Sequence, residues 1–97
     1  MSTNASQEEA SRKDSLIEYP SAFPIKVMGV NAEGFAAAVV EIAHRFDPTF
    51  DPAAVELRES KQGKYLGVTV TITATSRSQL DAIYGALSAN PMVKLVL

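Results

Sequence analysis

The sequence contains no cysteine, no tryptophan and a single histidine, His44. Without cysteine no disulfide can form, and one histidine without a thiol or a second imidazole does not make a transition-metal site. His44 lies roughly 200° around a predicted helix from Ile42, away from the apolar stripe, so we expect a solvated surface residue. No metal and no cofactor are expected.

Long apolar runs are also missing, and none approaches the about 20 residues that a membrane span requires. The first residues lack the basic start and apolar segment of a secretory signal, so we expect a cytoplasmic protein without membrane contact. Residues 20–97 carry as many acidic as basic side chains. A neutral domain has no overall field to gather phosphate backbones, so nucleic acid is not an expected general partner.

Apolar side chains are scarce in residues 1–14, which are rich in Ser, Glu, Asn and Lys. Such a segment cannot offset the entropy lost on ordering, so we expect a disordered tail. Residues 15–97 then form one domain, because a chain of 97 residues leaves no room for a second. Residues 15–22 are compatible with a helical turn or with an extended segment.

The clearest periodicity lies in residues 65–74, Tyr-Leu-Gly-Val-Thr-Val-Thr-Ile-Thr-Ala. Successive strand residues point to opposite faces of a sheet. One parity is apolar and comprises Leu66, Val68, Val70, Ile72 and Ala74. The other comprises Tyr65, Gly67, Thr69, Thr71 and Thr73. The pattern predicts a strand with one core face and one small, polar face.

Three more strands are predicted, at residues 23–29, 55–60 and 93–97. The second is the most polar, as a strand at a sheet edge would be. In the last, Val93, Leu95 and Leu97 have the core parity. Residues 61–63 form a tight hairpin before the long strand, with Gly63 free to adopt a positive φ.

Helical spacing extends from Asn31, a candidate N-cap, to Phe46, and again from Thr75 or Ser76 to the Asn-Pro pair at 90–91. Pro48 disfavours helix at the residue before it, so residues 47–54 are expected to form a loop. The acidic residues of this loop, at 47 and 51, lack the spacing of a calcium site and are interpreted as solvating residues.

The order strand, helix, strand, strand, helix, strand is that of the split βαβ, ferredoxin-like plait. The predicted class is therefore α+β, with a four-stranded antiparallel sheet in the order 4-1-3-2 and both helices on one face. The first and third strands are central in this order. The other face of the sheet, which we call the open face, is left without a helix layer.

The open face is the predicted interaction surface. Gly67 and the threonines let another backbone or ligand approach closely, and Met28 offers an adaptable apolar contact. The alternative is an ordinary solvated face of an antiparallel sheet. The candidate residues are Lys26, Met28, Arg58, Tyr65, Gly67, Thr69, Thr71, Thr73 and Lys94, with Glu56 and Val96 on the same predicted face.

No catalytic site can be assembled from the sequence. A nucleophile with a base, or paired carboxylates in a cleft, is not recognisable, so no catalytic residue is proposed and no enzyme is expected. Gly29, Val30 and Asn31, before the first helix, form a candidate loop for a small effector. Because Glu33 would place a negative charge where a phosphate binds, turn and capping chemistry is the structural alternative.

RNA-recognition domains share this architecture, but they stack bases on aromatic side chains of the sheet. The outward positions after Tyr65 are Gly67, Thr69 and Thr71, and one tyrosine is not a stacking platform. RNA binding remains an alternative because basic residues, Lys26, Arg58, Lys64 and Lys94, could line part of the open face.

Four segments carry a family resemblance: residues 19–29, Tyr-Pro-Ser-Ala-Phe-Pro-Ile-Lys-Val-Met-Gly; residues 60–65, Ser-Lys-Gln-Gly-Lys-Tyr; the Val-Thr-Val-Thr-Ile-Thr-Ala-Thr run at 68–75; and residues 92–97, Met-Val-Lys-Leu-Val-Leu. Over about residues 15–97 the chain resembles the YbeD family of small bacterial proteins. Gln62 makes the hairpin one residue longer than the family pattern. The resemblance implies a fold close to the ACT regulatory domains, which bind amino acids and other small effectors at paired interfaces, and it implies no catalytic residues.

The expected function is that of a non-enzymatic, ACT-like regulatory or protein-interaction module. Its open face or a strand edge would pair with another subunit or with a partner protein. The first alternative is a small-molecule sensor with its effector at residues 29–31. The second is an RNA-binding plait.

Overall fold

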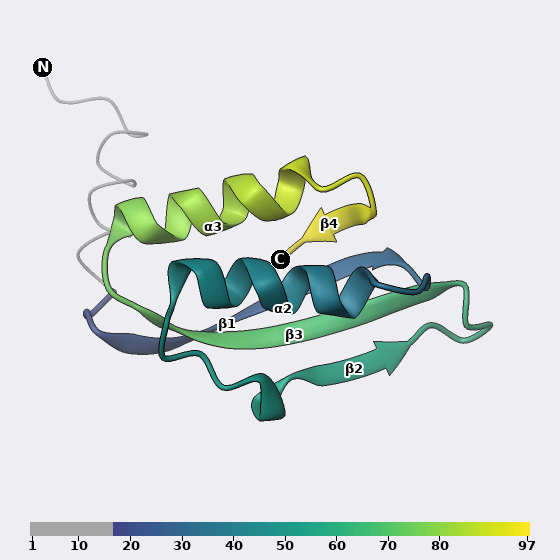
Figure 1. Cartoon of the computed structure of the whole chain (residues 1–97), viewed down its shortest axis with the longest axis horizontal. Helices are drawn as coiled ribbons and strands as arrows, with labels where there is room; N and C mark the ends of the chain where they lie inside the picture. The colour runs from purple at the N-terminus through teal and green to yellow at the C-terminus, as the bar shows by residue number, and fades with distance from the viewer. Residues whose placement is uncertain (1–16) are drawn as a thin grey trace, which may run out of the picture.

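The structure, a computed structural model, describes residues 17–97, so the predicted tail at residues 1–14 lies outside the described part (Figure 1). The elements are β1 (Ser21–Val30), α2 (Phe35–Phe46), a short 3₁₀ helix η1 (Pro52–Ala54), β2 (Glu56–Glu59), β3 (Tyr65–Ala74), α3 (Arg77–Ala89) and β4 (Val93–Val96). This confirms the predicted βαββαβ order. Residues 17–20 form bends around a cis Tyr19-Pro20 peptide, and the extended strand β1 begins at Ser21.

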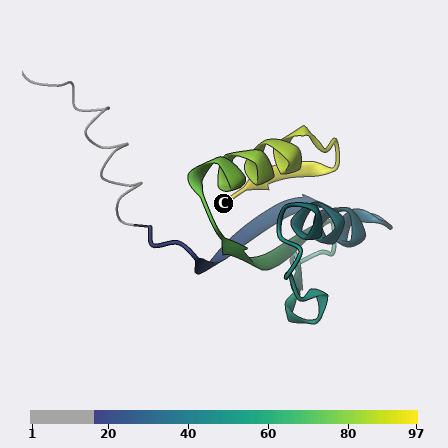
Figure 2. The same ribbon diagram turned by 60° about the vertical axis from the view of Figure 1, so that its left-hand side comes forward.

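The four strands form one antiparallel sheet in the order β2-β3-β1-β4. This is the predicted order read from the other edge, with β1 and β3 central. Both helices cover the same face of the sheet, as Figures 1 and 2 show. Within residues 17–97 the opposite face carries no helix. The predicted fold class is confirmed.

The core lies between the sheet and the helices. Every apolar residue predicted on the inner parity of β3 is buried, and Ile72 is only 1% exposed. From β1, Ile25 and Val27 pack beside them, and the helices add Phe35 and Ile83 among others. The ten-residue alternation of β3 therefore predicted both faces of the sheet correctly.

Asn31 does not cap the first helix, contrary to expectation. The helix α2 begins at Phe35, after Gly34, whose φ of 88° is a left-handed conformation that favours glycine. Asn31 instead fixes the β2–β3 hairpin: its side-chain amide donates to the Gly63 carbonyl at 2.8 Å, and its backbone N–H donates to the Lys64 carbonyl at 3.0 Å. In α3, by contrast, the Ser76 hydroxyl accepts from the Gln79 N–H at 3.0 Å and caps the helix.

Val93 has the predicted core parity, but the residues of the last strand after Lys94 have the opposite parity to the one predicted. Val27 is paired with Val96 and Met28 with Leu95, but Gly29 is paired with Val93, which leaves Lys94 as the extra residue of a bulge. Directly paired residues share a face, so Val96 faces the core and Leu95 faces outward. Leu97 exchanges two backbone hydrogen bonds with Lys26, at 2.8 and 3.2 Å, and faces outward too.

Asp47 is not a solvating loop residue, since it is 4% exposed. Its carboxylate accepts from the Thr49 hydroxyl at 2.6 Å, from the Thr49 N–H at 3.0 Å and from the Thr73 N–H of β3 at 2.8 Å. The Gln79 side-chain amide donates to the carbonyl groups of Phe46 and Thr73, both at 3.0 Å. Asp47 and Gln79 thus join the end of α2, the end of β3 and the start of α3.

Burial acts to raise the pKa of Asp47, but its hydrogen bonds and the nearby His44 outweigh burial and lower that pKa below its usual value. The hydrogen bonds come from the Thr49 side chain, then from the backbones of Thr73 and Thr49.

Candidate functional site on the open face

Two rows of side chains cross the open face from β2 to β4, because directly paired residues of antiparallel strands point the same way. The Lys26 row comprises Glu56, Thr69, Lys26 and Leu97. The Gly67 row, one step along the strands, comprises Arg58, Gly67, Met28 and Leu95. The rows bring together five of the nine predicted face residues: Lys26, Met28, Arg58, Gly67 and Thr69.

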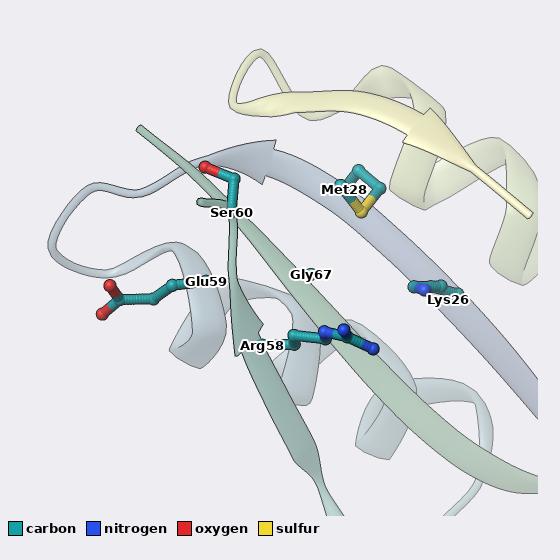
Figure 3. Close-up of a pocket in the computed structure, with 6 residues that line it drawn as sticks. All are labelled: Lys26, Met28, Arg58, Glu59, Ser60 and Gly67. Carbon is teal, nitrogen blue, oxygen red and sulfur yellow. The ribbon is translucent and has the colours of Figure 1, made fainter. Parts of the chain in front are cut away.

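A shallow hollow of about 170 Å³ lies over Gly67 and is lined by Lys26, Met28, Arg58, Glu59, Ser60 and Gly67 (Figure 3). Gly67 forms its floor because it has no side chain. A Cβ at that position would lie 3.2 Å from the Met28 sulfur and 3.7 Å from the Lys26 Cε. The hollow therefore depends on the glycine, because a side chain at this position would fill it. A position without a side chain is what the close approach of another backbone or ligand needs.

Two positive side chains converge over this hollow. Arg58 extends across β3 towards Lys26, while the Glu59 carboxylate points away from both (Figure 3). The Glu59 Oε1 lies instead beside the Gly63 turn. Neither Lys26 nor Arg58 has an ion-pair partner in residues 17–97, where the two ion pairs, Arg45 with Glu41 and Arg77 with Asp81, lie on the helices. The hollow is thus a positively charged surface without a counter-ion from the described chain.

Apolar side chains border the hollow on the β4 side. Leu95 and Leu97 are 51% and 62% exposed, and Met28 beside them is half-buried. On the other side, Tyr65 lies near the hairpin with the Lys64 ammonium 5.6 Å from its ring centroid. A base stacking on that ring would compete with the lysine, so the structure adds nothing to the aromatic platform that RNA recognition requires.

The remaining predicted face residues lie elsewhere. Thr71 and Thr73 point outward further along β3, opposite Pro24 and Ala22, where the sheet has only two strands. Lys94 was predicted on the open face, but the bulge removes it from the alternation. It lines a different hollow, of about 330 Å³, with Tyr84 and Ser88 of α3, where burial raises the pKa of Tyr84.

The sequence reasoning missed Leu95 and Leu97, which it assigned to the core, and Ser60. A short strand with alternating apolar residues gives no signal for a bulge. Which face Leu95 points to is decided by its pairing with Met28, and the sequence of the strand does not show that pairing. The hydrophobicity of Leu95 and Leu97 was visible, but their exposure was not.

The candidate effector loop makes contacts within the chain. Gly29 belongs to β1, and a Cβ on it would collide with the Phe35 ring and the Met92 carbonyl oxygen. The Val30 N–H donates to that same carbonyl at 3.2 Å. With Asn31 bonded to the hairpin, a ligand here would have to replace existing hydrogen bonds.

Residues 17–97 contain no group of three or more His, Cys, Asp or Glu side chains placed to hold a metal ion. In the same range no helix is long and apolar enough to cross a membrane.

Comparison with known proteins decides the family. Residues 14–97 match the family model described as "Protein of unknown function (DUF493)". A UPF0250 protein of Leptothrix cholodnii is 64% identical over 90 residues, which is 93% of this chain and 99% of that protein. The chain belongs to the YbeD family, also named UPF0250 and DUF493. Another member of the YbeD family, a UPF0250 protein of Bordetella pertussis, is 59% identical over 85 residues, or 88% of this chain and 93% of that protein.

The YbeD fold is also found in the solution structure of protein HP0495 from H. pylori. The two structures align with a TM-score of 0.69 and 20% sequence identity, over 84% of this chain and 85% of the other. This likeness confirms the ferredoxin-like fold. The names of these relatives state no enzymatic activity, substrate or partner.

Proposed function

We propose that this YbeD-family protein is a non-enzymatic regulatory or protein-interaction module whose open face binds another protein surface. The observation that carries the proposal is the hollow over Gly67. There Lys26 and Arg58, which have no ion-pair partner in residues 17–97, meet next to exposed leucines. A protein surface can meet both features at once, by supplying carboxylates and apolar side chains.

The distribution of exposed apolar residues supports the same surface. Of the four large hydrophobic residues exposed in residues 17–97, Tyr65, Leu95 and Leu97 lie on the open face. The fourth, Leu57, is on the edge strand β2. Exposed leucines grouped on one face, next to a hollow, are more typical of a contact surface than isolated surface leucines.

Site-specific photo-crosslinking tests the proposal. A benzophenone amino acid replaces Thr71, which is exposed on the open face, and the matched control carries it at Ala37, exposed on α2. After irradiation of the source bacterium, we expect covalent protein adducts from position 71 and none from position 37. Equal adducts from both positions, or none from position 71, would contradict an open-face contact.

A variant provides the second arm of this test. Adding Thr71→Arg to a protein with the crosslinker at Thr73 should leave the fold intact and remove the adducts, because a long charged side chain cannot enter a close contact. Unchanged adducts would show that the open face is not the functional surface.

A further inference from the structure

We propose that the open face binds a second copy of this chain, sheet against sheet, about a twofold axis that crosses the strands between the Lys26 row and the Gly67 row. The inference rests on the proposed function and names the partner. Such an axis places each strand over the same strand of the other copy, running in the opposite direction. Every residue of one row then faces the residue of the other row on the same strand.

This symmetry makes the charges on β2 complementary. Glu56 and Arg58 project from the same face of one strand, two residues apart. In the described part of the chain neither has an ion-pair partner. The axis places Arg58 opposite Glu56 of the partner subunit and, by symmetry, Glu56 opposite Arg58 of the partner subunit. One surface thereby supplies both members of two ion pairs, as a twofold interface requires.

The central strands allow the approach. On β3 the axis places Gly67 opposite Thr69 of the partner subunit, so the smallest side chains of the face meet where two sheets pack about 10 Å apart. On β1 it places the aliphatic part of Lys26 against Met28 of the partner subunit, while the ammonium group remains at the hollow.

The edge strand β4 supplies the apolar contact. Leu95 faces Leu97 of the partner subunit, and these two residues are among the most exposed hydrophobic side chains of the described chain. The bulge at Lys94 is what turns Leu95 outward. Exposed leucines at this edge, which have no role in the monomer's core, would be covered in the dimer.

The size of the face predicts a reversible dimer. With strands about 4.8 Å apart and residues about 3.3 Å apart, four strands and ten residues give a face of at most about 600 Å². This lies below the roughly 800 Å² per partner of a standard stable interface, so dissociation at low concentration is expected.

Charge exchange between Glu56 and Arg58 tests the axis. The full chain is studied by sedimentation velocity over a range of concentrations, and we expect dimer to increase with concentration. Arg58→Glu alone and Glu56→Arg alone should each weaken dimerisation about tenfold or more, because each places like charges opposite one another. Mixing the two single variants should restore a heterodimer, and the double variant Glu56→Arg/Arg58→Glu should restore the homodimer.

Matched controls distinguish a loss of dimerisation caused by the contact itself from one caused by a change in net charge. Lys94→Glu changes the charge as Arg58→Glu does, and Glu33→Arg changes it as Glu56→Arg does, but both residues lie off the two rows and outside the hollow over Gly67. Neither control should weaken the dimer. All of these side-chain changes are at exposed positions, and unchanged thermal midpoints show that the variants are folded.

The outcomes distinguish this inference from the proposed function. A chain that stays monomeric at every concentration, or a dimer that does not respond to the charge exchange, overturns the twofold contact. If the position-71 crosslinks then contain another protein, the open face still binds a partner and only the inference fails. If those crosslinks are absent as well, both fail.

Discussion

Neighbouring residues of β3 have opposite roles, and the difference comes only from the direction of the side chain. Ile72 is 1% exposed in the core, whereas Thr71 points outward and is exposed. Ten alternating residues were enough to predict this from the sequence. The hollow over Gly67 was not predictable in the same way, since Met28 and Arg58 come from other strands and only the register of strand pairing places them beside Gly67.

Ile72→Ala should reduce the free energy of unfolding by about 2–5 kcal/mol, because it leaves a cavity in the core. Thr71→Val should change it by no more than about 0.5 kcal/mol, as expected for a surface position. Urea denaturation followed by circular dichroism measures both. A larger loss for Thr71→Val than for Ile72→Ala would reverse the two faces of the sheet.

Element boundaries depend on contacts that are distant in sequence, and here prediction was less successful. Asn31 has the chemistry of an N-cap, but it bonds to the hairpin 32 residues away, and α2 begins at a left-handed glycine. Asp47 was misjudged for a similar reason: its strand partner, Thr73, is 26 residues further along the chain. The directions of Leu95, Val96 and Leu97 were predicted wrongly because the bulge at Lys94 reverses the alternation after it.

Asp47→Asn should lower the free energy of unfolding at neutral pH by about 1–3 kcal/mol, because hydrogen bonds to a charged acceptor are replaced by weaker ones. The folded-state pKa of Asp47 is depressed, so its contribution is present above the unfolded-state pKa and is lost as pH falls through the folded-state value. The parent should therefore lose its advantage over the variant in acid.

Urea denaturation between neutral and acidic pH provides the measurement, with Asp51→Asn as the control. Asp51 is an exposed acid in the same loop, where it accepts the Ala53 N–H at 2.9 Å. A gap between parent and Asp47→Asn that stays constant with pH would exclude a depressed pKa as its source.

At the scale of the whole molecule, the plait was predictable because its order follows from patterns within single elements. Strand alternation, helical spacing and one hairpin suffice to give the sheet order and the helix layer. The contact surface depends instead on which exposed residues neighbouring strands bring together. For that reason the sequence predicted that the open face exists, but it placed Lys94 on that face and assigned Leu95 and Leu97 to the core, and both assignments were wrong.

The same layering predicts where the molecule opens first. Every residue of β2 is exposed, whereas Ile25 and Val70 pair at the buried centre of the sheet. We expect the Leu57 amide in β2 to exchange with solvent at least about 100-fold faster than those of Ile25 and Val70, which should open only with the whole fold. Hydrogen exchange followed by NMR measures this, and similar rates at the three amides would show that β2 unfolds together with the core.

The short edge strands leave about half of the outer edge of each central strand unpaired, although β1 and β3 pair with each other throughout. The molecule protects these free backbone edges from strand addition. Beyond β2, the Thr73 N–H and carbonyl of β3 are already bound by Asp47 and Gln79. Beyond β4, Pro24 has the same parity in β1 as Lys26, whose N–H donates to the Leu97 carbonyl on the β4 side of the sheet. Its nitrogen therefore faces the free edge, where the missing proton removes a donor that an incoming strand would need. The contacts that join the helices to the sheet thus also occupy backbone groups that edge-to-edge aggregation would use.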